Sequence, residues 1–226
     1  MAEFDLAQTQ ALAELFETPR EARDDAWQTK FYAAVPDATL MGFDPQVNVG
    51  PDSFPYFHMA IPDPGPVTPF CVTHVLDFVL DNGIGIVIFG DSSRSEGPQW
   101  VFTYGDLLSY SMFGDFAGDP ATRDKEPAAG SGQMLVASPS ESYLPERARK
   151  AIGEYARRIF QMPAPKIALI DNGASRSLMI NLQQKQYGGD ENKIRAAMHY
   201  LGWFLPRGYR MMPMPDDWDD SAFTAI

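Results

Sequence analysis

The stretch KIALIDNGASRSLMINL (residues 166–182) decides how the C-terminal half of this chain folds. It contains two apolar runs, residues 166–171 and 175–182, on either side of Asn172 and Gly173. Asn-Gly is a strong hairpin signal because both residues tolerate the positive φ angles of a tight turn. The sequence therefore predicts two antiparallel strands joined by a short turn.

Helical patterns flank the predicted hairpin. Pro145 suits the first position of a helix, and apolar residues then recur at helical spacing through Phe160. After the hairpin, Asp190 can cap a helix that Pro206 ends, and Tyr209–Met214 is typical of a short strand. The order α-β-β-α-β packs most simply as a small antiparallel sheet with both helices on one face.

The N-terminal half predicts a second module of the same class. Helical patterns cover residues 4–17 and 20–34, and Pro19 and Pro36 end them. The other expected elements are strands over residues 39–43, 56–61, 84–89 and 99–104, a helix capped by Thr73 and a short helix over residues 106–113. The predicted fold class is α+β, with two modules that each hold a small mixed or antiparallel sheet and helices on one face.

Charge divides the chain in the same way. The 226 residues carry a net charge of −12, yet residues 144–215 hold 12 basic and five acidic side chains, whereas residues 1–143 hold six and 21. We predict an acidic module over residues 1–125, a linker over residues 126–143, a basic module over residues 144–215 and an acidic tail over residues 216–226. Such opposite charges can attract within the chain, between copies of it, or toward separate partners.

Composition limits the class of protein. Hydrophobic residues make up 45% and charged residues 21%, as in ordinary globular proteins. The single cysteine excludes a disulfide framework and a multi-thiolate metal centre. The first residues lack a signal-peptide pattern, and the apolar stretch Gly83–Gly90 is too short to cross a bilayer. We expect a cytoplasmic protein that does not bind a membrane.

Three stretches of the chain together carry a resemblance to a known family. They are an early helix that ends within Asp24–Met41, a Pro-Phe pair followed by a short helix and an apolar strand over Thr68–Phe89, and the helix and hairpin of Leu144–Leu182. Together with the following helix and Met-rich strand, they resemble the SseB (enhanced serine sensitivity) family. The resemblance implies a two-part α+β fold and brings no catalytic residues with it.

Cys71-x-x-His74, with His58 nearby in sequence, is the one grouping of Cys and His. Zinc needs about four ligands, of which these three could supply part, and a catalytic Cys–His pair would need the same closeness. The alternative is a buried cysteine beside ordinary histidines. We predict no metal or cofactor here, and an enzyme or small-molecule or metal-binding protein with a pocket near these residues stays an alternative function.

Four aspartates, Asp77, Asp81, Asp91 and Asp106, stand at the ends of expected helices and strands. Paired carboxylates could act as acid and base or hold Mg²⁺. Aspartates in such places usually form caps and turns, which is the interpretation we prefer.

The first helix of the basic module carries Arg147, Lys150 and Arg157 on the face away from its apolar residues. That face is either solvated or binds an acidic protein partner. Nucleic acid is not expected, because the strands of this module are aliphatic and lack the aromatic residues on which bases stack.

The sheet of the basic module offers a second candidate surface. Two helices cover one face, so Met179, Met212 and Met214 face the other way, with either Ile170 or Leu169. Methionine adapts to varied partners, and a large apolar patch is rarely left bare. We expect this face to pack against the first module or to bind a protein partner or a second copy.

The sequence therefore favours a non-catalytic interaction or regulatory protein that acts through charged and Met-bearing surfaces. An immunity-type antidote, or a chaperone-like binder of a basic client, is a special case of that function, because an acidic surface attracts a basic protein.

Overall fold

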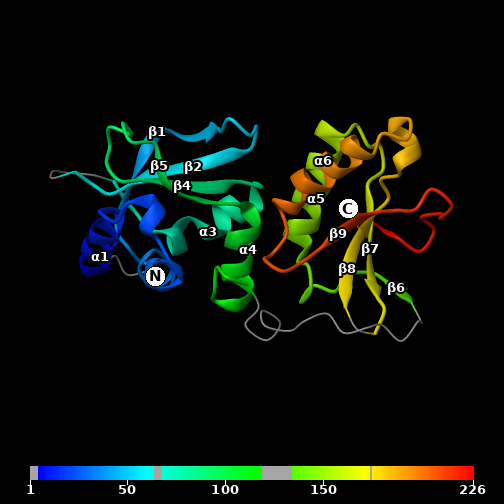
Figure 1. Ribbon diagram of the computed structural model, residues 1–226, viewed down its shortest axis with the longest axis horizontal. Coiled ribbons are helices and arrows are strands. Elements are labelled where there is room, and N and C mark those ends of the chain that lie inside the picture. The colour runs from blue at the N-terminus through cyan, green and yellow to red at the C-terminus, as the bar shows by residue number, and fades with distance from the viewer. Residues whose placement is uncertain (1–4, 64–67, 119–133, 174) are drawn as a thin grey trace. The chain divides into compact units, whose positions relative to one another are not determined.

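The computed structural model describes residues 5–63, 68–118, 134–173 and 175–226. The chain forms two compact units, Met1–Leu107 and Leu108–Ile226, and helix α4 (Tyr104–Phe113) contains the boundary between them. Each unit holds a five-stranded mixed sheet with helices, so the predicted α+β class is confirmed (Figure 1). Residues 126–133 of the predicted linker lie outside the described residues.

The N-terminal unit is built on a sheet with the strand order β3-β1-β2-β4-β5. Its elements are α1 (Leu6–Phe16), η1 (Arg20–Ala22), α2 (Asp25–Ala34), β1 (Leu40–Val49), β2 (Pro55–Ala60), β3 (Pro69–Phe70), α3 (Val72–Asp81), β4 (Gly85–Phe89) and β5 (Pro98–Phe102). Strands β2 and β4 are parallel and joined through α3, whereas the other pairs are antiparallel. Every residue of β4 is buried, as its apolar sequence predicts.

Aromatic side chains fill the core between the helices and the sheet of this unit. Phe31 on α2 is fully buried, stacked on Trp27 with ring centroids 5.1 Å apart, and its ring lies 4.7 Å from that of Trp100 on β5. The predicted helix over residues 20–34 is divided, because Asp24 accepts a hydrogen bond from the Trp27 amide and α2 starts there.

The prediction that Thr73 caps α3 is wrong. The cap residue is Cys71, which makes no side-chain cap bond. The Thr73 hydroxyl instead donates to the Pro36 carbonyl, 3.2 Å away, and contacts the Asp37 carboxylate at 3.0 Å. Thr73 therefore ties the start of α3 to the segment that follows α2.

The C-terminal unit is built on a sheet with the order β10-β7-β8-β9, and β6 also pairs with β7. Its elements are β6 (Leu135–Ala137), α5 (Glu146–Ile159), β7 (Lys166–Asp171), β8 (Arg176–Ile180), η2 (Gln184–Tyr187), α6 (Glu191–Gly202), β9 (Met211–Pro213) and β10 (Thr224–Ala225). The predicted hairpin is confirmed, with Ala168 opposite Met179. Asp190 caps α6 as predicted, but Pro145 is the residue before α5 rather than its first.

Helices α5 and α6 lie on one side of the strands of this unit, and the C-terminal segment lies on the other (Figure 1). The helix-facing side chains are apolar and buried, among them Ile152 on α5, Leu178 on β8 and Leu201 on α6. Two segments share the outer edge of β7: β6 pairs with Leu169–Asp171, and β10 pairs with Lys166–Ile167. The sheet therefore includes residues that the sequence assigned to a linker and to an acidic tail.

Candidate functional site

The Met-bearing face of the C-terminal sheet exists as predicted, but it is covered. Ala168, Ile170, Met179 and Met214 form one buried cluster with Phe223 from the C-terminal segment. Met179 is 4% exposed, and Ile170 and Met214 are buried almost as fully. Of the two choices for the fourth apolar residue, the cluster contains Ile170 and not Leu169.

The cover comes from residues 215–226, a segment that the sequence did not predict to lie on this face. Phe223 is buried on the cluster, and Trp218 packs against it together with the half-buried Met212. Because Met179 and Met214 lie under the chain's own residues, a partner can reach them only after this segment moves away. We call residues 215–226 the covering segment.

Polar contacts hold the covering segment on the basic sheet. The Asp220 carboxylate forms an ion pair with Lys166, with nitrogen and oxygen 2.9 Å apart, and accepts a hydrogen bond from Asn181 at 2.8 Å. The Lys166 contact lowers the pKa of Asp220, and the Asn181 bond lowers it further. Gln183 donates to the carbonyls of Pro215 and Trp218, 2.9 and 3.1 Å away. Asp220 thus ties the acidic tail to the module of opposite charge.

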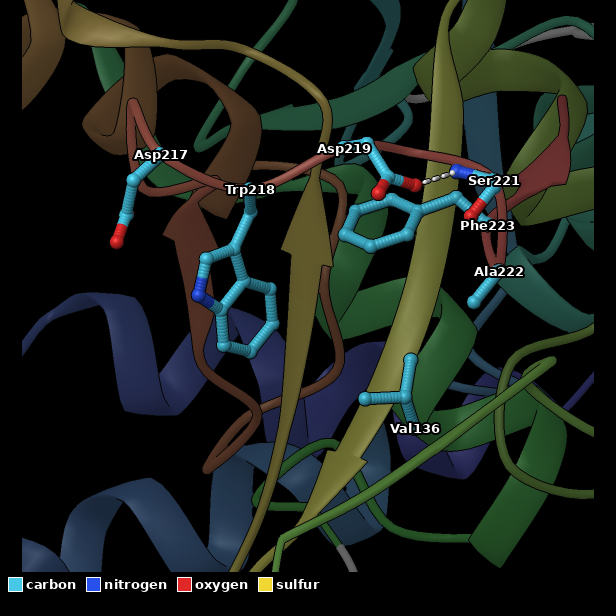
Figure 2. Close-up of a pocket in the computed structure, with 7 residues that line it drawn as sticks. All are labelled: Val136, Asp217, Trp218, Asp219, Ser221, Ala222 and Phe223. Atoms are coloured by element: carbon cyan, nitrogen blue, oxygen red, sulfur yellow. Dashed lines mark hydrogen bonds between the residues drawn. The ribbon is translucent and has the colours of Figure 1, made fainter.

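A hollow of about 330 Å³ remains beside the covering segment. Figure 2 shows the rings of Trp218 and Phe223 above Val136, with Asp217 and Asp219 on either side of Trp218. The Asp219 carboxylate accepts a hydrogen bond from the Ser221 amide at 2.9 Å, and the hydrogen bonds from Ser221 lower its pKa. The remaining lining residues are Ser221 and Ala222.

Strand β6, which lines this hollow through Val136, is exposed along its whole length. The side chains of Met134, Leu135 and Val136 are 51%, 61% and 38% exposed. Val136 pairs with Ile170 and so points to the same face of the sheet, toward the covering segment. In the described part of the chain, β6 pairs with one strand only, β7. Proteins usually protect such edges with charges or proline.

Part of the basic face of α5 contacts other residues of the C-terminal unit. Lys150 and Arg157 are exposed and Arg147 is half-buried. Arg157 donates a hydrogen bond to the carbonyl of Ile226, and Gly153 lies against that residue, because a Cβ atom at 153 would stand 2.7 Å from it. The covering segment therefore also reaches this helix.

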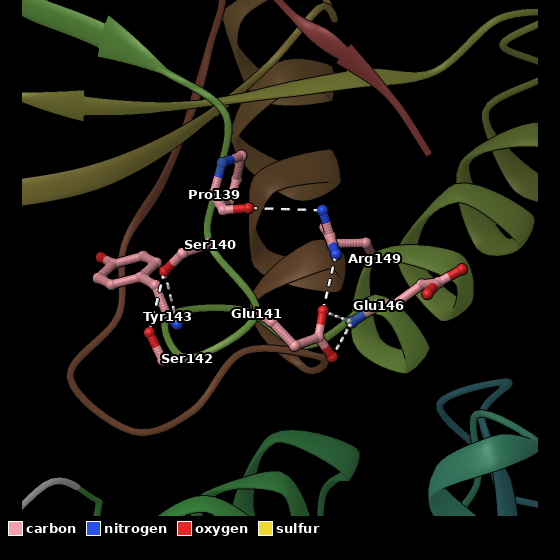
Figure 3. A network of polar contacts seen from close by, with 7 residues as sticks. All are labelled: Pro139, Ser140, Glu141, Ser142, Tyr143, Glu146 and Arg149. Carbon is pink, nitrogen blue, oxygen red and sulfur yellow. Dashed lines mark hydrogen bonds and ion pairs between the residues drawn. The ribbon is translucent and has the colours of Figure 1, made fainter.

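The start of α5 is capped by a side chain that the sequence did not single out. Glu141 accepts hydrogen bonds from the Glu146 amide at 2.9 and 3.0 Å and pairs with Arg149 at 2.9 Å (Figure 3). A carboxylate here balances the positive end of the helix dipole. This network orders the segment between β6 and α5.

His58 does not meet the cysteine and the second histidine of the alternative site. The neighbouring Phe57 packs against Phe70 and against Phe78 of α3, so His58 points to the opposite face of β2. There its ring lies 6.5 Å from that of Phe43 and 5.3 Å from that of Phe89. Burial lowers the pKa of His58, and the nearby Arg94 charge lowers it further.

Cys71 is buried and free, with its sulfur 3.2 Å from the Thr73 hydroxyl, and His74 is exposed on α3. Within residues 5–63, 68–118, 134–173 and 175–226, no group of three or more His, Cys, Asp or Glu side chains is placed to hold a metal ion. Burial and a nearby hydroxyl explain the cysteine as a core residue, which was the preferred interpretation.

Asp91 and Asp106 occupy turn and cap positions, as preferred from the sequence. Asp91 accepts hydrogen bonds from the amides of Ser93 and Arg94 at 2.8 and 3.1 Å, and the Ser93 bonds lower its pKa. Asp106 accepts from the Thr103 amide at 2.9 Å at the start of α4. Asp77 and Asp81 lie on the exposed side of α3.

Comparisons with protein-family models, with curated proteins and with solved structures find no match for this chain. The resemblance to the SseB family therefore stays a prediction. Among the described helices, none is both long and apolar enough to cross a bilayer.

Proposed function

We propose that this protein is an interaction module that binds an extended segment of another protein along strand β6. One observation carries the proposal: Leu135 and Val136 on strand β6, and Met134 directly before it, expose three consecutive apolar side chains at the edge of the C-terminal sheet. An added strand would satisfy backbone N–H and C=O groups and cover these side chains at the same time. The function expected from the sequence, protein interaction without catalysis, is kept, and its surface moves from the Met-bearing face to this edge.

A cytoplasmic location and an SseB-like relationship belong to the same proposal. The single cysteine, Cys71, is buried and free, which suits a reducing compartment. The basic face of α5, with Lys150 and Arg157 exposed, supports a second contact with an acidic protein. A basic client, as in an immunity-type or chaperone-like protein, is the special case that the acidic residues of the chain favour.

Selection of binding peptides tests the proposal. A library of displayed random dodecapeptides is enriched on the full-length protein, and the enriched peptides are measured against Val136→Lys and Val101→Lys. Val101 is the matched control, because it is an exposed valine on β5, the edge strand of the other sheet.

We expect the peptides to bind the wild type and the Val101→Lys variant equally and to bind Val136→Lys at least ten-fold more weakly. Thermal unfolding of both variants establishes that they fold. Enrichment of no peptide, or equal binding to both variants, would contradict the proposal.

A further inference from the structure

The hollow beside β6 is small and is lined by both apolar and polar side chains. Trp218 and Phe223 supply two aromatic rings, and Val136 supplies an aliphatic floor that is continuous with the exposed strand (Figure 2). Ligand pockets generally enclose about 300–1,000 Å³, so a hollow of about 330 Å³ holds one long side chain rather than a larger molecule.

Two carboxylates give this hollow its charge. Asp217 and Asp219 are both exposed and stand on either side of Trp218. Asp219 is held by the Ser221 amide, a bond that favours its ionised form, and among the described residues Asp217 makes no hydrogen bond or ion pair. The nearby cation, Lys166, is already paired with Asp220. Lys166 also attracts Asp219, but its one positive charge is shared with Asp220, so the opening keeps a net negative charge.

Arginine and lysine combine the two properties that this site needs. Their aliphatic stems pack on apolar surfaces while the charged head stays in water, and their cations are attracted to the face of an indole ring. An arginine head also donates two hydrogen bonds at once to a carboxylate. A neutral apolar side chain would fill the hollow but leave both carboxylates without a cation.

We infer that the hollow formed by Val136, Trp218 and Phe223 receives a basic side chain of the extended segment that pairs with β6, with Asp217 and Asp219 as its anionic partners. This inference rests on the proposed function and names the chemistry of the partner: an extended peptide with a Lys or Arg beside the apolar residues. A second copy of the chain is a poorer occupant, because pairing one β6 with another brings two sets of these carboxylates together.

The test compares two synthetic peptides on the full-length protein. Both are capped nonapeptides of alternating Thr and Val; one has Arg at its centre and the other has citrulline, a neutral side chain of nearly the same shape. Affinity is measured by titration calorimetry at low and high salt. We expect the Arg peptide to bind about ten-fold more tightly at low salt, with the difference shrinking as salt screens the charges.

The carboxylates are tested by the double variant Asp217→Asn, Asp219→Asn. Asparagine can still accept the hydrogen bond from Ser221, so the turn is kept. We expect the Arg peptide to bind this variant only as well as the citrulline peptide. Glu154→Gln is the matched control, because Glu154 is exposed on α5 and the change also removes a negative charge.

Failure of this inference differs from failure of the proposed function. Equal affinity for the two peptides, or full affinity for the Arg peptide in the double variant, would overturn the basic pocket and leave strand addition intact. A stable dimer in sedimentation that Val136→Lys dissociates and the Arg peptide does not would assign the edge to a second copy and overturn the inference as well. If, in addition, no library peptide binds the wild type more tightly than the Val136→Lys variant, both proposals would be overturned.

Discussion

Replacing Phe223 with alanine measures how firmly the covering segment is attached. Phe223 is 8% exposed and packs on Ala168, Ile170, Met179 and Met214. Burying a phenylalanine side chain contributes about 1.5–3 kcal/mol, and truncation in a closed core costs about 3–5 kcal/mol. Because this residue lies at the surface of the cluster and its segment can relax, we expect a loss of about 2–3 kcal/mol.

Hydrogen exchange is the appropriate assay, because the loss is expected in the covering segment and not in the whole unit. The Ile226 amide, which donates to the Pro165 carbonyl at 3.1 Å, reports on this segment. A loss of about 2–3 kcal/mol corresponds to exchange that is roughly 30- to 140-fold faster. Amides in the β7–β8 hairpin should change far less.

Ala222→Ser is the control for this experiment, because Ala222 is exposed in the same segment and a surface change there costs within about 0.5 kcal/mol. Unchanged exchange of the Ile226 amide in Phe223→Ala would refute the reasoning. Equal acceleration of the Ile226 and hairpin amides would also refute it, because the segment and the sheet would then open as one unit.

Two further predictions concern single contacts. Asp220→Asn should make hydrogen exchange of the covering segment less dependent on pH. Because Lys166 lowers the pKa of Asp220, the ion pair is fully formed above the ordinary carboxyl pKa of about 4 and is lost as pH falls through the lowered value. Exchange measured from pH 7 to 3 would detect this loss, and equal pH dependence in both proteins would contradict the prediction. Gly85→Ala should lower the free energy of unfolding of the N-terminal unit by more than about 1 kcal/mol, measured by urea titration. The added Cβ atom would stand 2.6 Å from the Phe102 carbonyl oxygen and 2.7 Å from the Tyr56 ring. An unchanged midpoint would contradict this prediction, because these neighbours would then have moved to make room.

Local patterns predicted the elements of the C-terminal sheet well. The β7–β8 hairpin, the alternation along β8 and the cap at Asp190 are short-range signals, and the structure has all three. The turn itself differs from the prediction, because Gly173 has a positive φ and Asn172 does not. The division of apolar residues between two faces follows from alternation alone, so the sequence is enough to predict the Met-bearing face.

The cover over that face could not be predicted in the same way. Residues 216–220 contain four aspartates, and such a run is typical of a solvated tail. Only Trp218 and Phe223 bring large apolar side chains to the cluster, and they follow no helical or strand period. Strand β6 was missed for a similar reason: its three residues are too few to show a period, and pairing with β7 defines them.

The way β7 completes its outer edge has a consequence for biosynthesis. The partner strand β10 is synthesised after the β7–β8 hairpin, so the hairpin exists before Thr224 and Ala225 can pair with it. Until then the nascent chain exposes a methionine-lined surface, and exposed apolar surface of this kind is prone to aggregation. The outer edge of β7 is therefore completed only once the covering segment has been synthesised.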